Sequence, residues 1–304
     1  MKIAVIGAGA MGSIYGGRLS LHNEVFLTAR RESLVQTIQE DGLKLVEDGE
    51  EHTYHPQAVM SADAIGTADL VIVFVKALQT EAALTEWGSI IGPDTYVLTL
   101  QNGAGHEAIL KKFVRPSRII IGTTEDNGTV LSPGVIRHGG TGRTNVGIPA
   151  GDSEAFLPKL KEAFDSCGFQ TIICEKIHQL IWNKLFTNAT LSTTTALLQV
   201  PMGYVGENPN AWHMVCSLLH EAITVARALG LEGDEKLLQE KIRQTALASP
   251  QAITSICADI KAGRKTEVDT ISGAVCAAAR QLKIPVPCQE FAVQMIHALE
   301  AKER

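Results

Sequence analysis

The chain has 304 residues, which exceeds the usual size of a single hydrophobic core and favours two domains. Hydrophobic residues make up 45% of the chain and charged residues 20%, a composition typical of soluble globular proteins. The formal net charge is −6, and no cluster of Lys and Arg interrupts the acidic balance. This charge excludes the broad basic surface of a nucleic-acid-binding protein, so any phosphate must be recognised locally.

The sequence gives no sign of export or of membrane insertion. The N-terminus lacks a basic stretch followed by an apolar run and a cleavage site, and the apolar runs fall short of the roughly 18 residues of a membrane span. The six cysteines form no CxxC motif and no pairing with histidine at metal-ligand spacing. We therefore expect mostly reduced core cysteines, no metal site and a cytoplasmic protein.

Short apolar strands alternate with helical stretches in the first half of the chain. A helix is expected over 11–22, and strands over 2–7, 24–28, 68–75, 96–100 and 118–123. The third strand is continuously apolar from 70 to 75, which is typical of a parallel sheet covered by helices on both faces. Shorter strands of antiparallel character are expected at 134–138 and 144–148, and a last strand at 170–174.

The first expected strand runs directly into a glycine-rich motif that opens the first helix. The motif is Gly7-Ala8-Gly9-Ala10-Met11-Gly12, which has the form G-x-G-x-x-G. In a dinucleotide-binding unit, the first glycine permits the tight turn, the second lets the backbone approach the pyrophosphate, and the third lets the helix pack on the strand. The pyrophosphate then lies at the positive end of the helix dipole. We expect all six residues to bind a nicotinamide dinucleotide.

The choice between NAD and NADP depends on the end of the second strand. An NAD site usually carries an acidic residue there that accepts hydrogen bonds from the ribose 2′-hydroxyl. Here the strand ends in Ala29-Arg30-Arg31, and no carboxylate appears before Glu32. A guanidinium can pair with a 2′-phosphate, so Arg30 favours NADP. The alternative is that Arg30 and Arg31 are solvated charges at a helix entry.

Three of the expected parallel strands end in polar residues, at the edge where open α/β sheets bind ligands. The polar residues that follow them are Lys76 with Gln79, Gln101 with Asn102, and Thr123 with Glu125. Lys76 directly after an apolar strand indicates a ligand-binding role rather than a random surface charge. Asn102 precedes a glycine, and this pair is also a turn signal, so a purely structural role for Asn102 stays open.

The second half is predicted to be helical, with expected helices over 177–198, 210–229, 235–247, 251–261, 267–282 and 289–301. The change of texture places a domain boundary near residue 175. The expected fold class is therefore α/β: an N-terminal Rossmann-type doubly wound sheet followed by an all-α C-terminal domain. We assign residues 1–175 to a dinucleotide-binding domain and residues 176–304 to a helical substrate and catalytic domain.

Two helical stretches are polar where a core helix should be apolar. Lys184, Asn188 and Ser192 recur every fourth residue and would share one helix face. Such a face could hold a polar substrate, or it could simply be solvated. The second stretch runs from 254 to 269, where Thr266 can cap a helix that begins near Glu267. By spacing alone, the Glu267 carboxylate could be an ordinary first-turn acid.

At these residues the sequence resembles the ketopantoate reductase family, also called 2-dehydropantoate 2-reductase, over nearly the whole chain. The matching landmarks are Gly7–Gly12, Val75-Lys76-Ala77-x-Gln79-Thr80, Gln101-Asn102-Gly103-x-Gly105, Gly122-Thr123-Thr124, Pro133-Gly134-x-Ile136-x-His138-x-Gly140, Trp182-x-Lys184-Leu185-x-x-Asn188 and Ser255-x-x-x-Asp259-x-x-x-Gly263-x-x-Thr266-Glu267-x-Asp269.

The resemblance implies an NADP-dependent oxidoreductase that reduces 2-dehydropantoate to (R)-pantoate on the way to pantothenate and coenzyme A. It implies that Lys184 is the catalytic lysine, and that Glu267 contacts the nicotinamide ribose and helps to orient Lys184. The substrate-binding residues would be Asn102, Asn188, Ser192 and Ser255. Beyond the glycine-rich motif, the cofactor-binding residues would be Arg30, Lys76, Gln79, Asn102, Gly128 and Glu267.

Two positions depart from the family pattern. Ser192 stands where members commonly have a second asparagine, and Met202 stands where some place another substrate-side asparagine. One alternative is therefore an NADP-dependent reductase of the same fold that acts on another 2-oxo or 3-hydroxy acid. An alternative of a different class is a non-catalytic NADP-binding protein. The expected partner is a small-molecule 2-oxo acid, and the long helices could support a homodimer.

Overall fold

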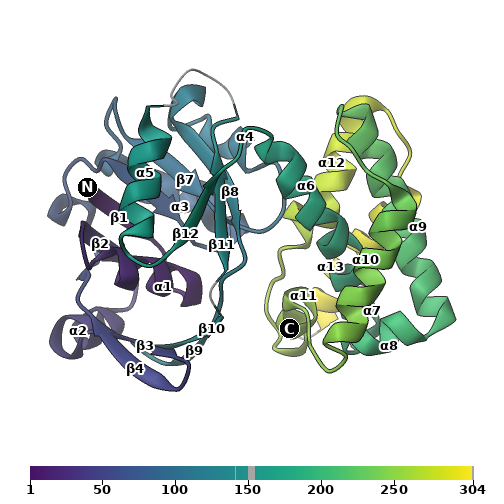
Figure 1. The fold of residues 1–304 in the computed structure, drawn as a ribbon, viewed down its shortest axis with the longest axis horizontal. Coiled ribbons are helices and arrows are strands. Elements are labelled where there is room, and N and C mark those ends of the chain that lie inside the picture. Colours follow the sequence, from purple (N-terminus) through teal and green to yellow (C-terminus); the bar gives the residue numbers. More distant parts are fainter. Residues whose placement is uncertain (141, 150–154, 303–304) are drawn as a thin grey trace. The chain divides into compact units, whose positions relative to one another are not determined.

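The computed structural model describes residues 1–140, 142–149 and 155–302. Two compact units make up the chain (Figure 1). One contains Met1–Gln101 and His106–Ile177, and the other contains Asn102–Gly105 and the chain from His178 onward. The first unit is a sheet with helices on it and a smaller sheet beside it, and the second is built of helices (Figure 1). The predicted α/β class with a helical C-terminal domain is confirmed.

The first unit is built on an eight-stranded sheet in the order β12-β11-β8-β7-β6-β1-β2-β5. The strands are β1 (Lys2–Ile6), β2 (Glu24–Thr28), β5 (Gln57–Val59), β6 (Leu70–Val73), β7 (Tyr96–Thr99), β8 (Ile119–Thr124), β11 (Arg143–Gly147) and β12 (Gln170–Ile173). The six neighbouring strands β8, β7, β6, β1, β2 and β5 are parallel to one another. In contrast, β11 runs antiparallel to β8. Every residue of β6 and β7 is buried, and for β6 the continuous apolar run predicted this.

Helices cover both faces of this sheet. They are α1 (Ala10–Leu19), α2 (Glu32–Asp41), α3 (Thr80–Glu86), α4 (His106–Leu110) and α5 (Phe156–Asp165). Because the chain leaves β1 and β6 in opposite directions across the sheet, right-handed crossovers place α1 and α3 on opposite faces. On the α1 face, Tyr15 packs edge-on against Phe164 of α5, with 6.0 Å between ring centroids. The point between β1 and β6 is where such sheets bind dinucleotides.

A second, four-stranded sheet has the order β4-β3-β10-β9. Its strands are β3 (Leu43–Glu47), β4 (Glu50–Tyr54), β9 (Asn127–Ser132) and β10 (Val135–Gly140). Of these, sequence patterning predicted only β10. It missed β4 because that strand is polar and almost fully exposed, and it missed β9 because most of its residues face solvent. A strand without a buried face carries no alternation of apolar residues to detect.

A buried polar network joins α1 to both sheets. His138 of β10 lies between Glu47, 2.7 Å from its Nδ1, and Asp126, 3.0 Å from its Nε2. The Tyr15 hydroxyl lies 2.9 Å from Thr124 Oγ1 and 3.2 Å from Asp126 Oδ2. The bond to Asp126 outweighs burial and raises the pKa of His138. This network fixes the helix that carries the glycine-rich motif.

The helical unit surrounds its own apolar core. Its elements are α6 (Ile177–Thr187), a π-helical turn (Asn188–Ser192), α7 (Thr193–Leu198), α8 (Met202–Glu207), α9 (Pro209–Ala228), α10 (Glu235–Ala248), α11 (Ser255–Lys261), a 3₁₀ turn (Val268–Thr270), α12 (Ser272–Leu282) and α13 (Pro287–Lys302). The predicted helix over 177–198 is confirmed in its bounds, and a π-helical turn interrupts its α geometry in the middle. The helix expected to begin near Glu267 begins at Ser272, after the 3₁₀ turn.

The cysteines carry no disulfide. All six are free: three are buried, two are half-buried, and Cys288 is exposed. Within the described ranges, no helix combines the length and the apolar character needed to cross a bilayer.

Candidate active site

Two glycines of the motif have no room for a side chain. Gly7 has a φ of +109°, and a Cβ there would lie 3.0 Å from the backbone nitrogen of Val75. A Cβ on Gly12 would lie only 1.8 Å from the carbonyl oxygen of Gly7. Glycine at both positions therefore lets α1 begin directly against the ends of β1 and β6.

Gly9 is different, because it faces open space. It is the N-cap residue of α1, and a Cβ there would meet no described atom within 4 Å. The first turn of α1 contains no acidic residue, and no side chain in the described part of the protein caps it. Uncapped backbone N–H groups with free space before them suit a pyrophosphate. The residues of this turn thus fit a dinucleotide.

The end of β2 holds the turn in place and presents Arg30 beyond it. The Gly7 N–H donates to Thr28 Oγ1 at 3.2 Å, and the Ala8 N–H donates to the Thr28 carbonyl at 3.1 Å. Arg30 follows and is 58% exposed, with its Nη2 at 3.8 Å from the Glu86 carboxylate of α3. The guanidinium is accessible and only weakly paired.

Lys76 and Gln79 lie in the segment that follows β6, and both are exposed. Gly128 lies in β9, against the start of α1. A Cβ on Gly128 would come within 2.5 Å of Ile14 Cδ1 and 3.4 Å of Ala10 Cβ. Close packing against α1 therefore accounts for this glycine, and its contact with a cofactor stays a prediction.

Gln101 is a residue whose role the sequence did not reveal. Its side-chain amide donates to the Val75 carbonyl and, at 2.9 Å, to Thr80 Oγ1, while its Oε1 accepts from Thr99 Oγ1 at 2.8 Å. The side chain is buried, and these bonds fasten the segment containing Lys76 to the end of β7. A glutamine directly after a buried apolar strand was the available signal.

Asn102 and Glu267 are far apart in the sequence, but their segments lie next to each other in the helical unit. Thr270 donates its hydroxyl to the Asn102 carbonyl at 3.2 Å, and also lies 3.2 Å from the Glu267 carbonyl. The Ala104 N–H donates to the Thr270 carbonyl at 2.9 Å. Gly103 between them has a φ of +98°, and a Cβ there would lie 2.0 Å from that carbonyl oxygen. The backbones of two predicted cofactor-binding residues, Asn102 and Glu267, thus both contact Thr270 of one 3₁₀ turn.

The segment before this turn is held by the C-terminal helix. Glu300 accepts from Lys265 Nζ at 2.7 Å, from the N–H and hydroxyl of Thr266 at 2.8 Å each, and lies 3.1 Å from His297 Nδ1. Burial alone would raise the pKa of Glu300, but these bonds outweigh it and lower the pKa to about 2. The ionised Glu300 therefore fixes the residues adjoining Glu267.

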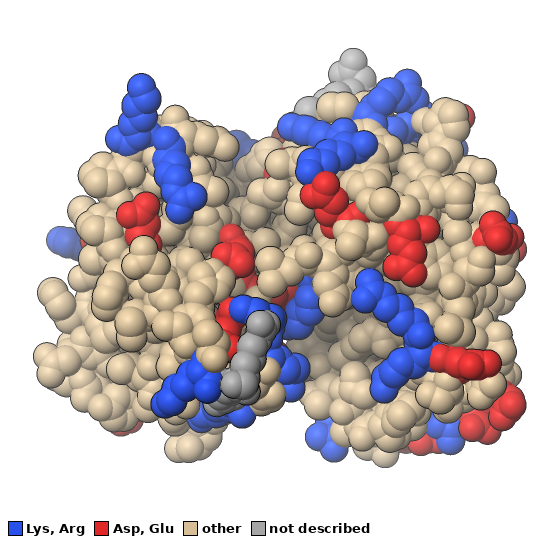
Figure 2. Space-filling model, turned by 180° about the vertical axis from the view of Figure 1, so that it is seen from behind, with Lys and Arg blue, Asp and Glu red and all other residues tan. Residues whose placement is uncertain are grey.

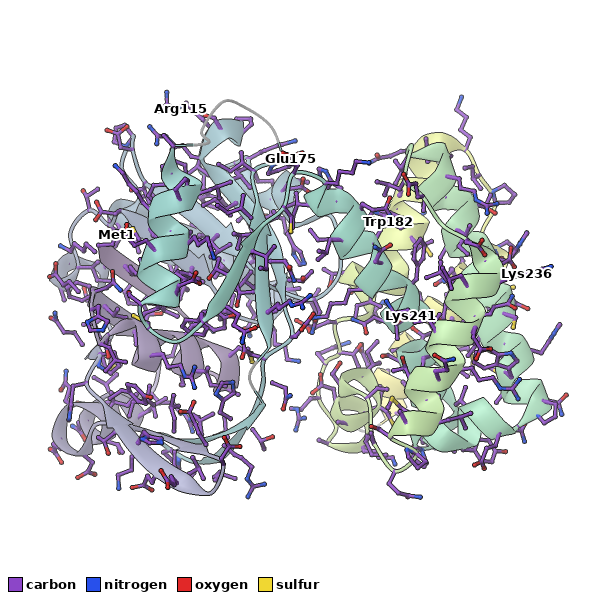
Figure 3. The ribbon with its side chains drawn as sticks, in the orientation of Figure 1. Met1, Arg115, Glu175, Trp182, Lys236 and Lys241 are labelled. Carbon is purple, nitrogen blue, oxygen red and sulfur yellow. The ribbon has the colours of Figure 1, made fainter. Side chains whose placement is uncertain are left out.

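The predicted polar stripe of the helical unit is only partly regular. Lys184 lies half-buried on α6, on which Trp182 is labelled in Figure 3. Asn188 is the first residue of the π-helical turn and is half-buried, and Ser192 is the last and is 7% exposed. The turn from Asn188 to Ser192 therefore has π geometry in place of the expected α geometry.

Ser255 is exposed and is the first residue of α11. The preceding residue, Thr254, connects the start of α11 to the segment that contains Ser192. Its hydroxyl lies 2.7 Å from Thr195 Oγ1 and 3.5 Å from the Ser192 carbonyl. Ser192 and Ser255 thus flank the same threonine. Met202 is the first residue of α8, and its N–H donates to the Ala252 carbonyl at 3.0 Å.

The side chains of the described residues include no group of three or more His, Cys, Asp or Glu that could hold a metal ion. On the face shown in Figure 2, Lys and Arg occur beside Asp and Glu, and neither sign covers the surface. The candidate residues of the first unit are the backbone N–H groups at the start of α1, Arg30 and Lys76. Those of the helical unit are Lys184, Glu267 and neutral polar side chains.

Sequence comparison identifies a family for both parts of the chain. The model of "Ketopantoate reductase PanE/ApbA" matches residues 3–151, and that of its C-terminal region matches residues 176–300. The 2-dehydropantoate 2-reductase of Halobacterium salinarum is 32% identical over 289 residues, which cover 94% of this chain and 95% of that protein. The enzyme of the same name from Pyrococcus abyssi is 31% identical over 303 residues, covering 100% and 99%.

Solved structures agree with this assignment. The ternary structure of D-mandelate dehydrogenase with NADH and anilino(oxo)acetate superposes with a TM-score of 0.92 at 32% identity, covering 100% of this chain and 99% of that one. A PanE/ApbA family ketopantoate reductase from Ralstonia eutropha gives a TM-score of 0.89 at 27% identity, with coverage of 100% and 99%. The chain belongs to the ketopantoate reductase PanE/ApbA family, a family of oxidoreductases.

Proposed function

We propose that this protein catalyses the NADPH-dependent reduction of 2-dehydropantoate to (R)-pantoate. The observation that carries the proposal is that one chain joins an open glycine-rich helix start to a helical unit in which Asn102 and Glu267 meet at one turn. Cofactor binding alone does not require the second arrangement. We further propose that residues 1–175 bind the cofactor, that residues 176–304 bind the substrate, and that the enzyme is cytoplasmic.

The first unit is proposed to bind NADPH, which supplies the hydride when bound. The backbone N–H groups from Gly7 to Gly12 hold the pyrophosphate, because they lie at the positive end of α1. Arg30 pairs with the 2′-phosphate and gives up its weak contact with Glu86. Lys76, Gln79 and Gly128 complete the set of residues that contact the cofactor.

The helical unit is proposed to bind the oxo acid and stabilise its reduction. The keto oxygen becomes negatively charged as the carbon is reduced, and Lys184 donates a hydrogen bond and then a proton to it. Ser255, the exposed first residue of α11, binds the substrate carboxylate through its hydroxyl. Asn188 and Ser192 bind the rest of the oxo acid. Asn102 and Glu267 orient the nicotinamide, and Glu267 also orients Lys184.

The test of this assignment is the variant Lys184→Ala. We expect kcat to fall by a factor of roughly 10³ or more while the Kd of NADPH changes less than about threefold, because the lysine acts on the oxo acid. Lys184→Arg is the matched control, since it keeps the charge and the packing but transfers a proton poorly, and it should also be slow. Near-normal turnover of Lys184→Ala would contradict the proposal.

A second candidate is a reductase of the same fold that acts on another 2-oxo acid. Two observations favour it: the TM-score of 0.92 with D-mandelate dehydrogenase, a structure that contains NADH, and the residues Ser192 and Met202. A serine is shorter than asparagine and lacks its fixed donor and acceptor pair, and methionine cannot bind a substrate hydroxyl strongly. This candidate predicts that 2-oxo acids without a hydroxyl on the side chain are preferred.

A further inference from the structure

The turn Asn188–Ser192 is a π-helical turn between two α-helices. In such a turn each N–H reaches the carbonyl five residues back, so the helix widens and the following side chains rotate. π turns are rare in proteins, and where they occur they are often associated with functional sites. This one begins and ends on residues proposed above to bind substrate, so whatever fixes the turn also fixes their directions.

Threonine hydroxyls inside the segment favour the turn. Thr190 Oγ1 donates to the Phe186 carbonyl at 2.6 Å, and Thr193 Oγ1 donates to the Asn188 carbonyl at 3.4 Å. A hydroxyl that bonds the carbonyl one turn back competes with the backbone N–H and bends a helix. These local bonds promote a departure from α geometry. The carbonyl of Ala189 lies within the same turn.

Two side chains from other helices donate hydrogen bonds to the Ala189 carbonyl. Ser272 Oγ of α12 donates to the Ala189 carbonyl at 3.3 Å, and Gln289 Nε2 of α13 lies 3.4 Å from the same oxygen. Ser272 also lies 2.9 Å from Thr193 Oγ1, one residue beyond the turn. Both side chains have no exposed surface, so water does not compete with their bonds.

Gln289 is itself held in place by α9. Glu221 of α9 accepts the Gln289 N–H at 2.8 Å and the Cys288 N–H at 2.9 Å, which fixes the first turn of α13. The Gln289 side chain then reaches the Ala189 carbonyl and, at 3.0 Å, the Leu218 carbonyl. Its Oε1 is buried without a partner among the described atoms. A buried residue with only a packing role would avoid that penalty by being apolar.

We propose that Ser272 and Gln289 are positioning residues for the substrate pocket. Through the Ala189 carbonyl they hold the π-helical turn, and the turn sets the directions of Asn188 and Ser192. Neither residue touches the substrate. The inference rests on the proposed function, because it gives Asn188 and Ser192 the role assigned to them there.

The kinetic test uses Ser272→Ala, Gln289→Met and the double variant, which remove the donors and keep most of the packing. We expect the KM for 2-dehydropantoate to rise about tenfold in each single variant and further in the double variant, while the KM for NADPH stays within about twofold. The matched control is Asp234→Ala, which removes the N-cap of α10, a 3.0 Å bond to Leu237 N, and so destabilises the same unit away from the turn. Equal effects on both KM values, or the same KM rise in Asp234→Ala, would overturn the proposal.

A second readout does not depend on activity. Amide hydrogen exchange over residues 186–195 of the free protein should be at least about tenfold faster in the double variant than in the wild type, and unchanged in Asp234→Ala. Wild-type exchange in the double variant overturns the proposal whatever the kinetics show. If exchange is faster in the double variant but the wild type turns over no 2-oxo acid, the role of Ser272 and Gln289 in holding the turn is supported. Only the proposed function is then refuted.

Discussion

Thr270 donates its hydroxyl hydrogen to the carbonyl oxygen of Asn102 at 3.2 Å, although the two residues are 168 positions apart in the sequence. Asn102 lies shortly after the end of β7, and the bond attaches it to the 3₁₀ turn that follows Glu267. Asn102–Gly105 consequently belongs to the helical unit while the chain on either side belongs to the other. Four residues of the first half are thus part of the proposed substrate domain.

The first prediction concerns Gly103, which permits this contact. In Gly103→Ala, the new Cβ would meet the Thr270 carbonyl at 2.0 Å in a backbone with a φ of +98°. We expect a loss of roughly 2–4 kcal/mol in the free energy of unfolding and a higher KM for NADPH, because Asn102 must move away from Glu267. Denaturant unfolding and steady-state kinetics measure both.

Gly105→Ala is its matched control. Gly105 also has a positive φ, of +88°, but a Cβ there meets nothing within 4 Å. It should cost only the strain of the backbone, about 1 kcal/mol, with normal kinetics. Equal effects of the two substitutions would show that the Asn102–Thr270 contact is unimportant.

The second prediction separates the two uses of glycine in the dinucleotide motif. Gly9→Ala meets no described atom within 4 Å, so the melting temperature should hardly change, but the methyl group occupies the space before α1. We expect the Kd for NADPH to rise at least about tenfold. Gly12→Ala places a Cβ 1.8 Å from the Gly7 carbonyl, so it should lower the melting temperature as well. Tight NADPH binding by Gly9→Ala, measured by fluorescence titration, would argue against a pyrophosphate at this turn.

The third prediction concerns cofactor choice. In Arg30→Ala the Kd for NADPH should rise by a factor of roughly 10 to 100, whereas the Kd for NADH should change less than about threefold, because only NADPH carries the 2′-phosphate. Glu86→Gln should tighten NADPH binding slightly, since the weak ion pair at 3.8 Å competes for the guanidinium. Equal affinities of the wild type for the two cofactors, determined by calorimetry, would refute the role of Arg30.

The fourth prediction is a pH dependence that originates at Glu300. Its pKa in the folded protein is about 2, below its ordinary value of 4.5, so its ionised form stabilises the fold above pH 4.5. That contribution falls as the pH drops from there towards 2. Glu300→Gln should therefore reduce the free energy of unfolding by about 2 kcal/mol at neutral pH.

The difference in the free energy of unfolding between the wild type and Glu300→Gln should be smaller by roughly 1 kcal/mol at about pH 4 than at neutral pH. The reason is that the carboxyl takes up protons in the unfolded chain at this lower pH. Denaturant unfolding at the two pH values measures it. A difference that stays constant, or grows, on acidification would mean that the bonds from Lys265 and Thr266 do not hold the pKa down.

The sequence was sufficient to predict the parts of the fold that rest on strong local patterns. The continuous apolar run at β6 predicted a buried parallel strand, and the spacing of Gly7, Gly9 and Gly12 predicted the turn between β1 and α1. In each case the physical requirement, burial on both faces or absence of a side chain, acts directly on the residue type.

What the sequence could not predict depends on contacts between distant segments. Four-residue spacing made Lys184, Asn188 and Ser192 look like one α-helical face, but the π-helical turn is held partly by Ser272 and Gln289, which lie far away in the chain. The hold of Gln101 on the segment after β6 is likewise set by tertiary structure. When a polar residue has several possible hydrogen-bond partners, the sequence does not identify the one that it contacts.

The proposed function is tested by kcat/KM with NADPH for 2-dehydropantoate and for the 2-oxo acid that corresponds to mandelate, both measured with the same enzyme preparation. We expect a preference for 2-dehydropantoate of at least about a hundredfold, with pantoate as the product. A preference for the mandelate-related acid, or turnover of several 2-oxo acids but none of 2-dehydropantoate, would contradict it.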